Sequence, residues 1–216
     1  MFIKRTIKNI LGSLLAFLPV PAQAGAYEDV LTAVKRDNGS EISVLVAKGV
    51  DANTVDAQGN TLLMLAVKEG SLNATKALLA SGAQINRANP LGETALMLAA
   101  LNNRPEMIRM LVSGGAEVNR EGWTPLIYAA TRGNVEVAKL LLAYGANVNA
   151  QGENGFTALM MAAYEGNAPV ARLLLNSGAD TTLTNYSNKT AMQLARERAQ
   201  LDVVAILEQA AKAAPK

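Results

Sequence analysis

Two residue types that carry much protein chemistry are missing from this 216-residue chain, which has no cysteine and no histidine. Without cysteine there is no disulfide, no thiolate metal site and no thiol nucleophile. Without histidine the commonest general base and the commonest metal ligand are missing too. Aromatic residues make up only 4% of the chain and charged residues 18%, whereas half of the residues are hydrophobic. This composition is typical of a folded protein, and it argues against an enzyme or a cofactor-binding protein.

The chain also lacks a strong net charge. Its 20 basic and 18 acidic residues give a formal charge of +2. Three basic residues, Lys4, Arg5 and Lys8, precede residue 25, and removing them leaves 17 basic and 18 acidic residues, a net charge of −1. The remaining chain therefore offers no electrostatic support for a nucleic-acid or anionic-membrane partner.

The N-terminal segment, from Met1 to Ala24, has the three-part pattern of a secretory signal peptide. A basic segment precedes the apolar run Ile10 to Val20, and Ala22-Gln23-Ala24 supplies small residues ahead of a cleavage site. Pro19 and Pro21 favour extended backbone before that site. Eleven helical residues rise only about 16 Å, against about 30 Å for the hydrocarbon core of a membrane. We therefore expect cleavage after Ala24 and a periplasmic protein with no membrane insertion, although secretion to the medium stays open.

The rest of the chain consists of several copies of one sequence repeat. Five threonines each open an apolar segment, and they recur in steps of 33, 30, 33 and 33 along the chain: Thr61, Thr94, Thr124, Thr157 and Thr190. Five glycines recur in steps of 33, 33, 30 and 33: Gly49, Gly82, Gly115, Gly145 and Gly178. The two series indicate one repeating unit of constant length, with one copy shortened by three residues between Gly115 and Thr124.

These segments resemble ankyrin repeats. The family pattern reads G-x-T-P-L-H-x-A-A, followed by a second helix that ends L-L-L-x-x-G-A-D-V-N. It is matched closely by Thr124-Pro125-Leu126, Ala129-Ala130, Leu140-Leu141-Leu142 and Gly145 to Asn149. The resemblance covers roughly residues 27 to 212. It implies an all-α solenoid of helix-turn-helix units joined by β-hairpin-like loops, with about six stacked repeats including two caps.

The repeat pattern predicts both the helix ends and the domain organisation. The threonine hydroxyls cap the first helices, and glycines such as Gly70, Gly133 and Gly166 end them in the left-handed conformation. Terminal repeats need polar outer faces and act as caps. We expect a signal peptide at residues 1–24, an N-terminal capping repeat at 25–57, four repeats at 58–186, a C-terminal capping repeat at 187–212 and a tail at 213–216.

The motif histidine of the family is replaced in every repeat. Its place is taken by Met64, Met97, Ile127, Met160 and Gln193. The resemblance implies that this histidine supports a local hydrogen-bond network, so we expect that network to be weaker here or replaced by apolar packing. The three methionines could also suggest a soft-metal site, such as one for copper. Packed helices lie about 8–10 Å apart, too far to share one ion, so we expect core packing and no metal or cofactor.

The few aromatic residues are the most informative candidates for a binding surface. The resemblance implies that residues beside the capping threonines, and those after the alanine pair, face a concave groove. This assignment gives a predicted protein-binding set of Leu91, Leu101, Trp123, Arg132, Phe156, Tyr164 and Tyr186. Large aromatic side chains that face solvent are unusual unless they meet a partner. The alternative for Trp123 is local packing over the shortened loop, and the sequence leaves both open.

The resemblance implies a non-catalytic, monomeric module that binds a partner protein through its concave face and hairpin tips. Exported bacterial ankyrin proteins similar to this chain can hold or neutralise an enzyme of the cell envelope, so we expect an inhibitor or immunity protein. An accessory factor for an oxidative-stress enzyme such as catalase is the alternative. An enzyme or metal carrier would need a carboxylate cluster or a methionine site, and neither is evident in the sequence. The sequence does not identify the partner.

Overall fold

The structure is a computed structural model that describes the backbone of residues 20–213 and the side chains of residues 25–212. Residues 1–19, with the basic segment and nearly all of the apolar run of the expected signal peptide, lie outside this part, as does the end of the expected tail. The chain divides into two compact units, whose boundary in the sequence lies between Ala95 and Leu96. We call them the first unit and the second unit and describe each by itself.

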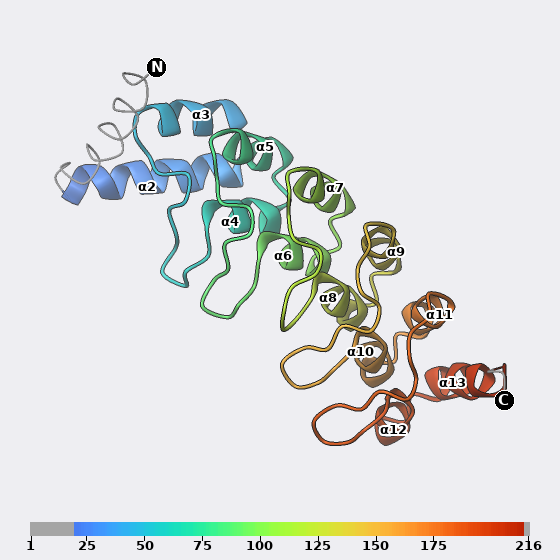
Figure 1. The fold of residues 1–216 in the computed structure, drawn as a ribbon. Helices are drawn as coiled ribbons and strands as arrows, with labels where there is room; N and C mark the ends of the chain where they lie inside the picture. Colours follow the sequence, from blue (N-terminus) through green and yellow to red (C-terminus); the bar gives the residue numbers. More distant parts are fainter. Residues whose placement is uncertain (1–19, 214–216) are drawn as a thin grey trace, which may run out of the picture. The chain divides into compact units, whose positions relative to one another are not determined.

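Four helices form the described part of the first unit (Figure 1): α2 (Val20–Lys35), α3 (Gly39–Ala47), α4 (Leu62–Glu69) and α5 (Leu72–Ala80). Helix α2 packs against α3 and α4, and α5 packs against α3 and α4. The unit is therefore a stack of two helix pairs. Helix α2 begins upstream of the expected cleavage site, with Pro21 in its first turn, where a missing amide hydrogen breaks no helical bond. The prediction of extended backbone at Pro21 is therefore wrong.

The second unit repeats the same arrangement in two layers (Figure 1). Its inner layer contains α6 (Ala95–Leu101, except the first residue), α8 (Pro125–Arg132), α10 (Ala158–Glu165) and α12 (Ala191–Glu197). Its outer layer contains α7 (Pro105–Ser113), α9 (Val135–Ala143), α11 (Ala168–Asn176) and α13 (Leu201–Ala213). Helix α10 packs against α8 and α12, while α9 packs against α7 and α11. The long loops project from the inner layer, away from the outer helices.

The predicted all-α fold is confirmed. Between residues 20 and 213 the structure contains helices and a single isolated bridge, which pairs Val55 with Thr61, but no strand. The loops therefore turn back like hairpins without forming a ladder. None of the helices in this range combines the length and the hydrophobicity needed to cross a bilayer.

Threonine caps the start and glycine the end of α4, α8 and α10, as the sequence predicts. The hydroxyl oxygens of Thr61, Thr124 and Thr157 accept hydrogen bonds at 3.2, 3.3 and 3.2 Å from the amides three residues later. Gly133 and Gly166 end α8 and α10 with φ of 72° and 81°, a left-handed conformation that glycine adopts without steric cost. The two ends of α8 and of α10 therefore follow from local sequence.

The core consists of small and medium-sized apolar side chains. The alanine pairs Ala99-Ala100, Ala129-Ala130 and Ala162-Ala163 are fully buried, which allows neighbouring helices to approach closely. Met64, Met97 and Met160 are at most 2% exposed. The prediction that these methionines fill the core is confirmed.

The repeats that contain Met64 and Gln193 keep a hydrogen bond at the position of the missing histidine. The sulfur of Met64 accepts the amide of Thr61 at 3.4 Å, and the side-chain oxygen of Gln193 accepts the amide of Thr190 at 2.8 Å. Each completes a capping box with the threonine hydroxyl. In these repeats the network is therefore retained with a different acceptor, a result that the sequence did not predict.

Candidate protein-binding surface

Trp123 and Phe156 occupy equivalent places immediately before the threonines that cap α8 and α10. Thr124 and Thr157 have extended backbone, with ψ of 158° and 168°, so the chain runs away from each helix before it begins. The capping bonds fix these two residues. The two aromatic side chains therefore lie where the projecting loops meet the inner layer of the second unit.

Trp123 is half-buried and contacts its surroundings on two sides. Its ring meets the ring of Tyr128 edge-on, with centroids 5.6 Å apart and an angle of 60° between the planes. The indole also lies against Gly152 of the following loop, because a Cβ at that position would be 3.4 Å from the indole Cδ1. Trp123 therefore combines local packing with a partly accessible ring, and its contact with a partner stays a prediction.

Phe156, Tyr164 and Arg198 form a chain of contacts across α10 and α12. The rings of Phe156 and Tyr164 are nearly perpendicular, at 87°, with centroids 6.4 Å apart. The guanidinium carbon of Arg198 lies 4.4 Å from the centroid of the Tyr164 ring, within the range of a cation–π interaction. The carbonyl oxygen of Tyr164 accepts a hydrogen bond from the Gln200 side chain at 3.3 Å. Tyr164 is therefore held by the next repeat through both its ring and its backbone.

Tyr186 has an exposed side chain on a firmly held backbone. Its side chain is 76% exposed. Its amide donates to the carbonyl oxygen of Asn154 at 3.1 Å, and the side chain of Asn185 accepts two amides of the same loop. The ring lies close to Gly155, where a Cβ would be only 2.8 Å from the ring carbon Cδ1. The structure thus presents Tyr186 on an ordered loop rather than on a free tip.

The remaining predicted residues do not join these contacts. Leu91 is 80% exposed, but it belongs to the first unit. Leu101 is half-buried at the end of α6, where its carbonyl oxygen accepts the Asn134 side chain at 3.3 Å. Arg132 is exposed at the end of α8. Of the seven residues, the structure records a direct ring contact only between Phe156 and Tyr164.

Two residues of this surface were missed by the sequence interpretation. Tyr128 contacts Trp123, and Arg198 covers Tyr164. Arg198 follows Thr190 by eight positions, as Arg132 follows Thr124, so the repeat register could have indicated it. No comparable signal existed for Tyr128, because an aromatic residue inside a first helix is equally compatible with the core.

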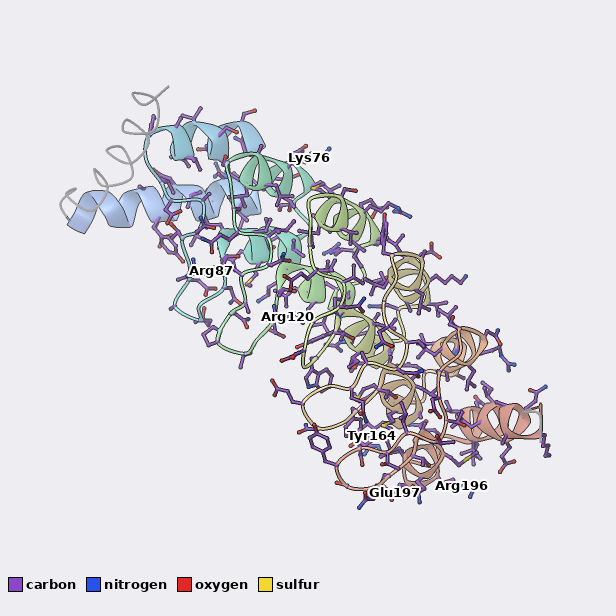
Figure 2. The ribbon with its side chains drawn as sticks, viewed as in Figure 1. Lys76, Arg87, Arg120, Tyr164, Arg196 and Glu197 are labelled. Atoms are coloured by element: carbon purple, nitrogen blue, oxygen red, sulfur yellow. The ribbon has the colours of Figure 1, made fainter. Side chains whose placement is uncertain are left out.

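The charged side chains around Tyr164 are mostly paired with one another. Arg196 binds Glu208 at 3.0 Å, and Lys189 binds Glu197 at 2.7 Å. Figure 2 shows Tyr164 beside the helix that carries Arg196 and Glu197. The ion pairs of the described residues do not include Arg198 or Arg132. The surface therefore combines aromatic rings with two cations that have no carboxylate partner within residues 25–212.

The described residues contain no cluster of three or more histidine, cysteine, aspartate or glutamate side chains that could hold a metal ion. What this surface offers chemically is aromatic faces, a stacked guanidinium and an exposed phenol. Such groups are common anchors at protein–protein interfaces.

Comparison with known families assigns this repeat architecture. A family model described as ankyrin repeats in three copies matches residues 29–89 and 85–152, and a second, described as ankyrin repeats in many copies, matches residues 141–195. The chain belongs to the ankyrin repeat family. Ankyrin repeats are typically non-catalytic scaffolds, and they indicate a protein–protein interaction module.

A solved structure supports the same assignment. The ankyrin repeat chain is 34% identical to the ankyrin repeat domain of Bcl-3, described as a unique member of the IkappaB protein family. The match covers 83% of this chain and 81% of the Bcl-3 chain, with a TM-score of 0.72. A search of curated proteins found no match. Because 603 solved chains resemble this ankyrin repeat protein, the likeness identifies its scaffold and not its partner.

Proposed function

We propose that this protein binds a partner protein through the aromatic surface of its second unit, which we define as Trp123, Tyr128, Phe156, Tyr164 and Tyr186. The observation that carries this proposal is the exposed but ordered ring of Tyr186, together with the Phe156–Tyr164–Arg198 contacts. Exposed aromatic side chains present apolar area to water. A partner that covers them buries this area, which lowers the free energy of the complex.

The rigidity of these residues favours tight binding. Backbone hydrogen bonds hold the Tyr186 loop, and ring contacts already fix Trp123, Phe156 and Tyr164. Immobilising a side chain on binding usually costs about 0.5–1.5 kcal/mol, and a side chain that is already fixed avoids part of that cost. Truncation of an aromatic anchor of this kind to alanine weakens binding by about 2 kcal/mol or more.

Further residues extend the proposed surface. Leu101 and Arg132 belong to the same unit, at the ends of α6 and α8. We include these two as peripheral contacts, which contribute less than the aromatic residues because they lack ring contacts. Leu91, an exposed apolar side chain on a loop of the first unit, is proposed as a contact residue of that unit by itself.

We further propose that the protein is exported to the bacterial periplasm and acts there as a monomer that inhibits an enzyme of the cell envelope. The signal-peptide pattern of residues 1–24 supports export. The absence of cysteine is compatible with an oxidising compartment, because no thiol is at risk of mispairing. The inhibitor role rests on the resemblance to exported ankyrin proteins described above.

Export has a direct test. A bacterial host that expresses the full chain is fractionated, and the N-terminal sequence of the protein is determined in each fraction. The proposal predicts a periplasmic protein that begins at Gly25. Intact protein that begins at Met1 and remains in the cytoplasm would contradict it.

Partner binding is tested by affinity capture from envelope extract with three baits of residues 25–216. One bait is wild type, the second carries Trp123→Ala, Phe156→Ala and Tyr164→Ala, and the third carries Lys139→Ala, Tyr144→Ala and Arg172→Ala. The third bait is the matched control, because its three substitutions lie on or next to outer helices and remove exposed side chains. Circular dichroism establishes that the three baits are equally helical.

The outcomes separate the possible roles. A protein retained by the wild-type and control baits and lost by the aromatic variant supports the proposed surface. If that protein is a wall-active hydrolase or a toxin whose activity falls on binding, the inhibitor role is supported. Capture of a catalase would favour the accessory role instead. Equal retention by all three baits would contradict the proposed surface.

A further inference from the structure

Arg198, at the end of α12, contacts an aromatic ring, whereas the nearby cations Lys189 and Arg196 pair with carboxylates. Its guanidinium carbon lies 4.4 Å from the Tyr164 ring centroid. The neighbouring basic side chains are neutralised, since Arg196 pairs with Glu208 and Lys189 pairs with Glu197. Within residues 25–212 no ion pair engages Arg198, and its side chain is exposed.

Stacking uses the flat face of a guanidinium and leaves its edge available. The five N–H donors of arginine point outward in the plane of the group, so a cation above a ring can still donate to an acceptor at its edge. The ring beneath Arg198 is itself fixed, because Phe156 meets Tyr164 at 87° and Gln200 binds the Tyr164 backbone. The donor edge of Arg198 is therefore oriented before any partner arrives.

The surroundings of this donor edge indicate which kind of acceptor it binds. Planar bidentate pairing with a guanidinium is a property of carboxylates and phosphates. Nucleic-acid binding requires several cations along a track. Here the exposed carboxylate of Glu165 occupies the register position between Arg132 and Arg198, and the other basic side chains near Arg198 are paired. A single carboxylate beside an apolar group fits this arrangement of one cation and two aromatic rings.

We propose that Arg198 binds a carboxylate of the partner protein, an aspartate or glutamate side chain that is adjacent in sequence to an apolar residue in contact with Phe156 and Tyr164. This inference rests on the proposed function, because it specifies the chemistry of the partner at the same surface. Glu165 repels an acidic partner and thereby sets where the carboxylate lies. Arg198 acts by direct contact, and Tyr164 acts by orienting it.

The proposal is tested by selecting short random peptides that bind the full protein and then measuring the affinity of the selected peptides. Four variants are compared with the wild type: Arg198→Gln removes the charge, Arg198→Lys keeps the charge without the planar fork, Glu165→Gln removes the repelling carboxylate, and Arg172→Gln is the control. Arg172 is exposed on an outer helix and belongs to none of the described ion pairs. Thermal unfolding establishes that each variant is folded.

The expected peptides contain aspartate or glutamate next to an aromatic or aliphatic residue. Their affinity falls about tenfold or more with Arg198→Gln, falls similarly with Arg198→Lys, and rises about two- to threefold with Glu165→Gln, with no change for Arg172→Gln. Their affinity also falls as sodium chloride is raised, because the interaction is between charges at the surface.

Two results would overturn the inference, and they differ in what they say about the proposed function. Peptides that lose affinity with Phe156→Ala but not with Arg198→Gln, or that carry no acidic residue, would overturn the carboxylate while leaving the aromatic surface intact. Peptides whose affinity does not change with substitutions of Phe156, Tyr164 and Arg198 would count against both the carboxylate contact and the aromatic surface. A selection that yields no binding peptide would do the same.

Discussion

The indole of Trp123 lies against the backbone of Gly152, in the following loop of the second unit. The loops that contain Asn89 and Asn185 have an asparagine at this place, whose side chain accepts two amides of its own loop. Gly152 lacks that side chain, and the Gln151 side chain instead donates to the carbonyl oxygen of Gly155 at 3.0 Å. A Cβ at position 152 would already be in van der Waals contact with the indole, so a larger side chain there would extend beside the ring of Trp123.

Replacing this glycine should release the indole. In Gly152→Asn the new side chain competes with Trp123 for the same space, and we expect the fluorescence of this single tryptophan to shift to longer wavelength and to become more accessible to a soluble quencher. Gly145→Asn is the matched control, because no atom lies within 4 Å of a Cβ there and asparagine tolerates its φ of 81°. Identical spectra for the two variants would show that Gly152 does not shape the surface.

A second glycine pair separates backbone strain from contact between repeats. Gly133 and Gly145 both have left-handed φ, so alanine at either costs about 1 kcal/mol in strain. Only at Gly133 would the added Cβ meet another repeat, 2.7 Å from the side-chain oxygen of Asn167. That asparagine donates to the carbonyl oxygens of Ala130 and Thr131 at 2.8 and 3.1 Å. Gly133→Ala should therefore lose about 1–2 kcal/mol more than Gly145→Ala in urea denaturation. Equal losses would mean that the Asn167 contact has no energetic weight.

The sulfur acceptor of Met64 should contribute measurably to stability. Leucine has a similar volume but no acceptor, so Met64→Leu leaves the buried amide of Thr61 without the bond it makes at 3.4 Å. We expect a loss of about 1 kcal/mol in the free energy of unfolding. At Met160 the described contacts contain only the threonine-hydroxyl half of the cap, so Met160→Leu should cost less. A larger loss for Met160→Leu than for Met64→Leu would contradict this account.

The first unit should become less stable in acid because of Asp56. Burial acts to raise the pKa of this carboxyl, but hydrogen bonds from the side chain and the amide of Asn60 outweigh burial and hold the pKa below its ordinary value of 3.8. A group whose pKa is lowered on folding stabilises the fold above its unfolded pKa, and that contribution is lost as the pH falls through the folded pKa.

The measurement is the thermal midpoint of the wild type and of Asp56→Asn between about pH 5 and pH 2.5. Asparagine keeps the acceptor for the loop amides, as Asn89 and Asn185 show, and removes only the titrating charge. The wild type should lose more stability than the variant below about pH 4. Parallel curves for the two proteins would indicate that Asp56 is not linked to folding.

Local signals made much of the fold predictable from the sequence. The threonine series placed the N-termini of the inner helices, since each hydroxyl acts on an amide only three residues away. Pro105, Pro125 and Pro169 fall in the first turns of helices, where the ring is tolerated. The buried methionines were also predictable, because the regular repeat gives them equivalent places.

Contacts between repeats were not predictable in the same way. The stacking of Arg198 on Tyr164 joins residues 34 positions apart, and the packing of Trp123 against Gly152 joins residues 29 positions apart. Each depends on the side-chain directions of two helices or loops at once, which a single sequence does not specify. The predicted site therefore contained Phe156 and Tyr164, whose rings are in contact, but not Arg198, which covers one of them.

The most direct test of the central claim is the dissociation constant of the captured partner, measured by titration calorimetry with the wild type and the two triple variants described above. The account predicts that Trp123→Ala, Phe156→Ala and Tyr164→Ala together weaken binding at least about a hundredfold, roughly 2.7 kcal/mol, whereas the outer-helix control stays within about threefold of the wild type. Equal dissociation constants for the wild type and the aromatic variant, with all three proteins folded, would contradict the claim that this surface binds the partner.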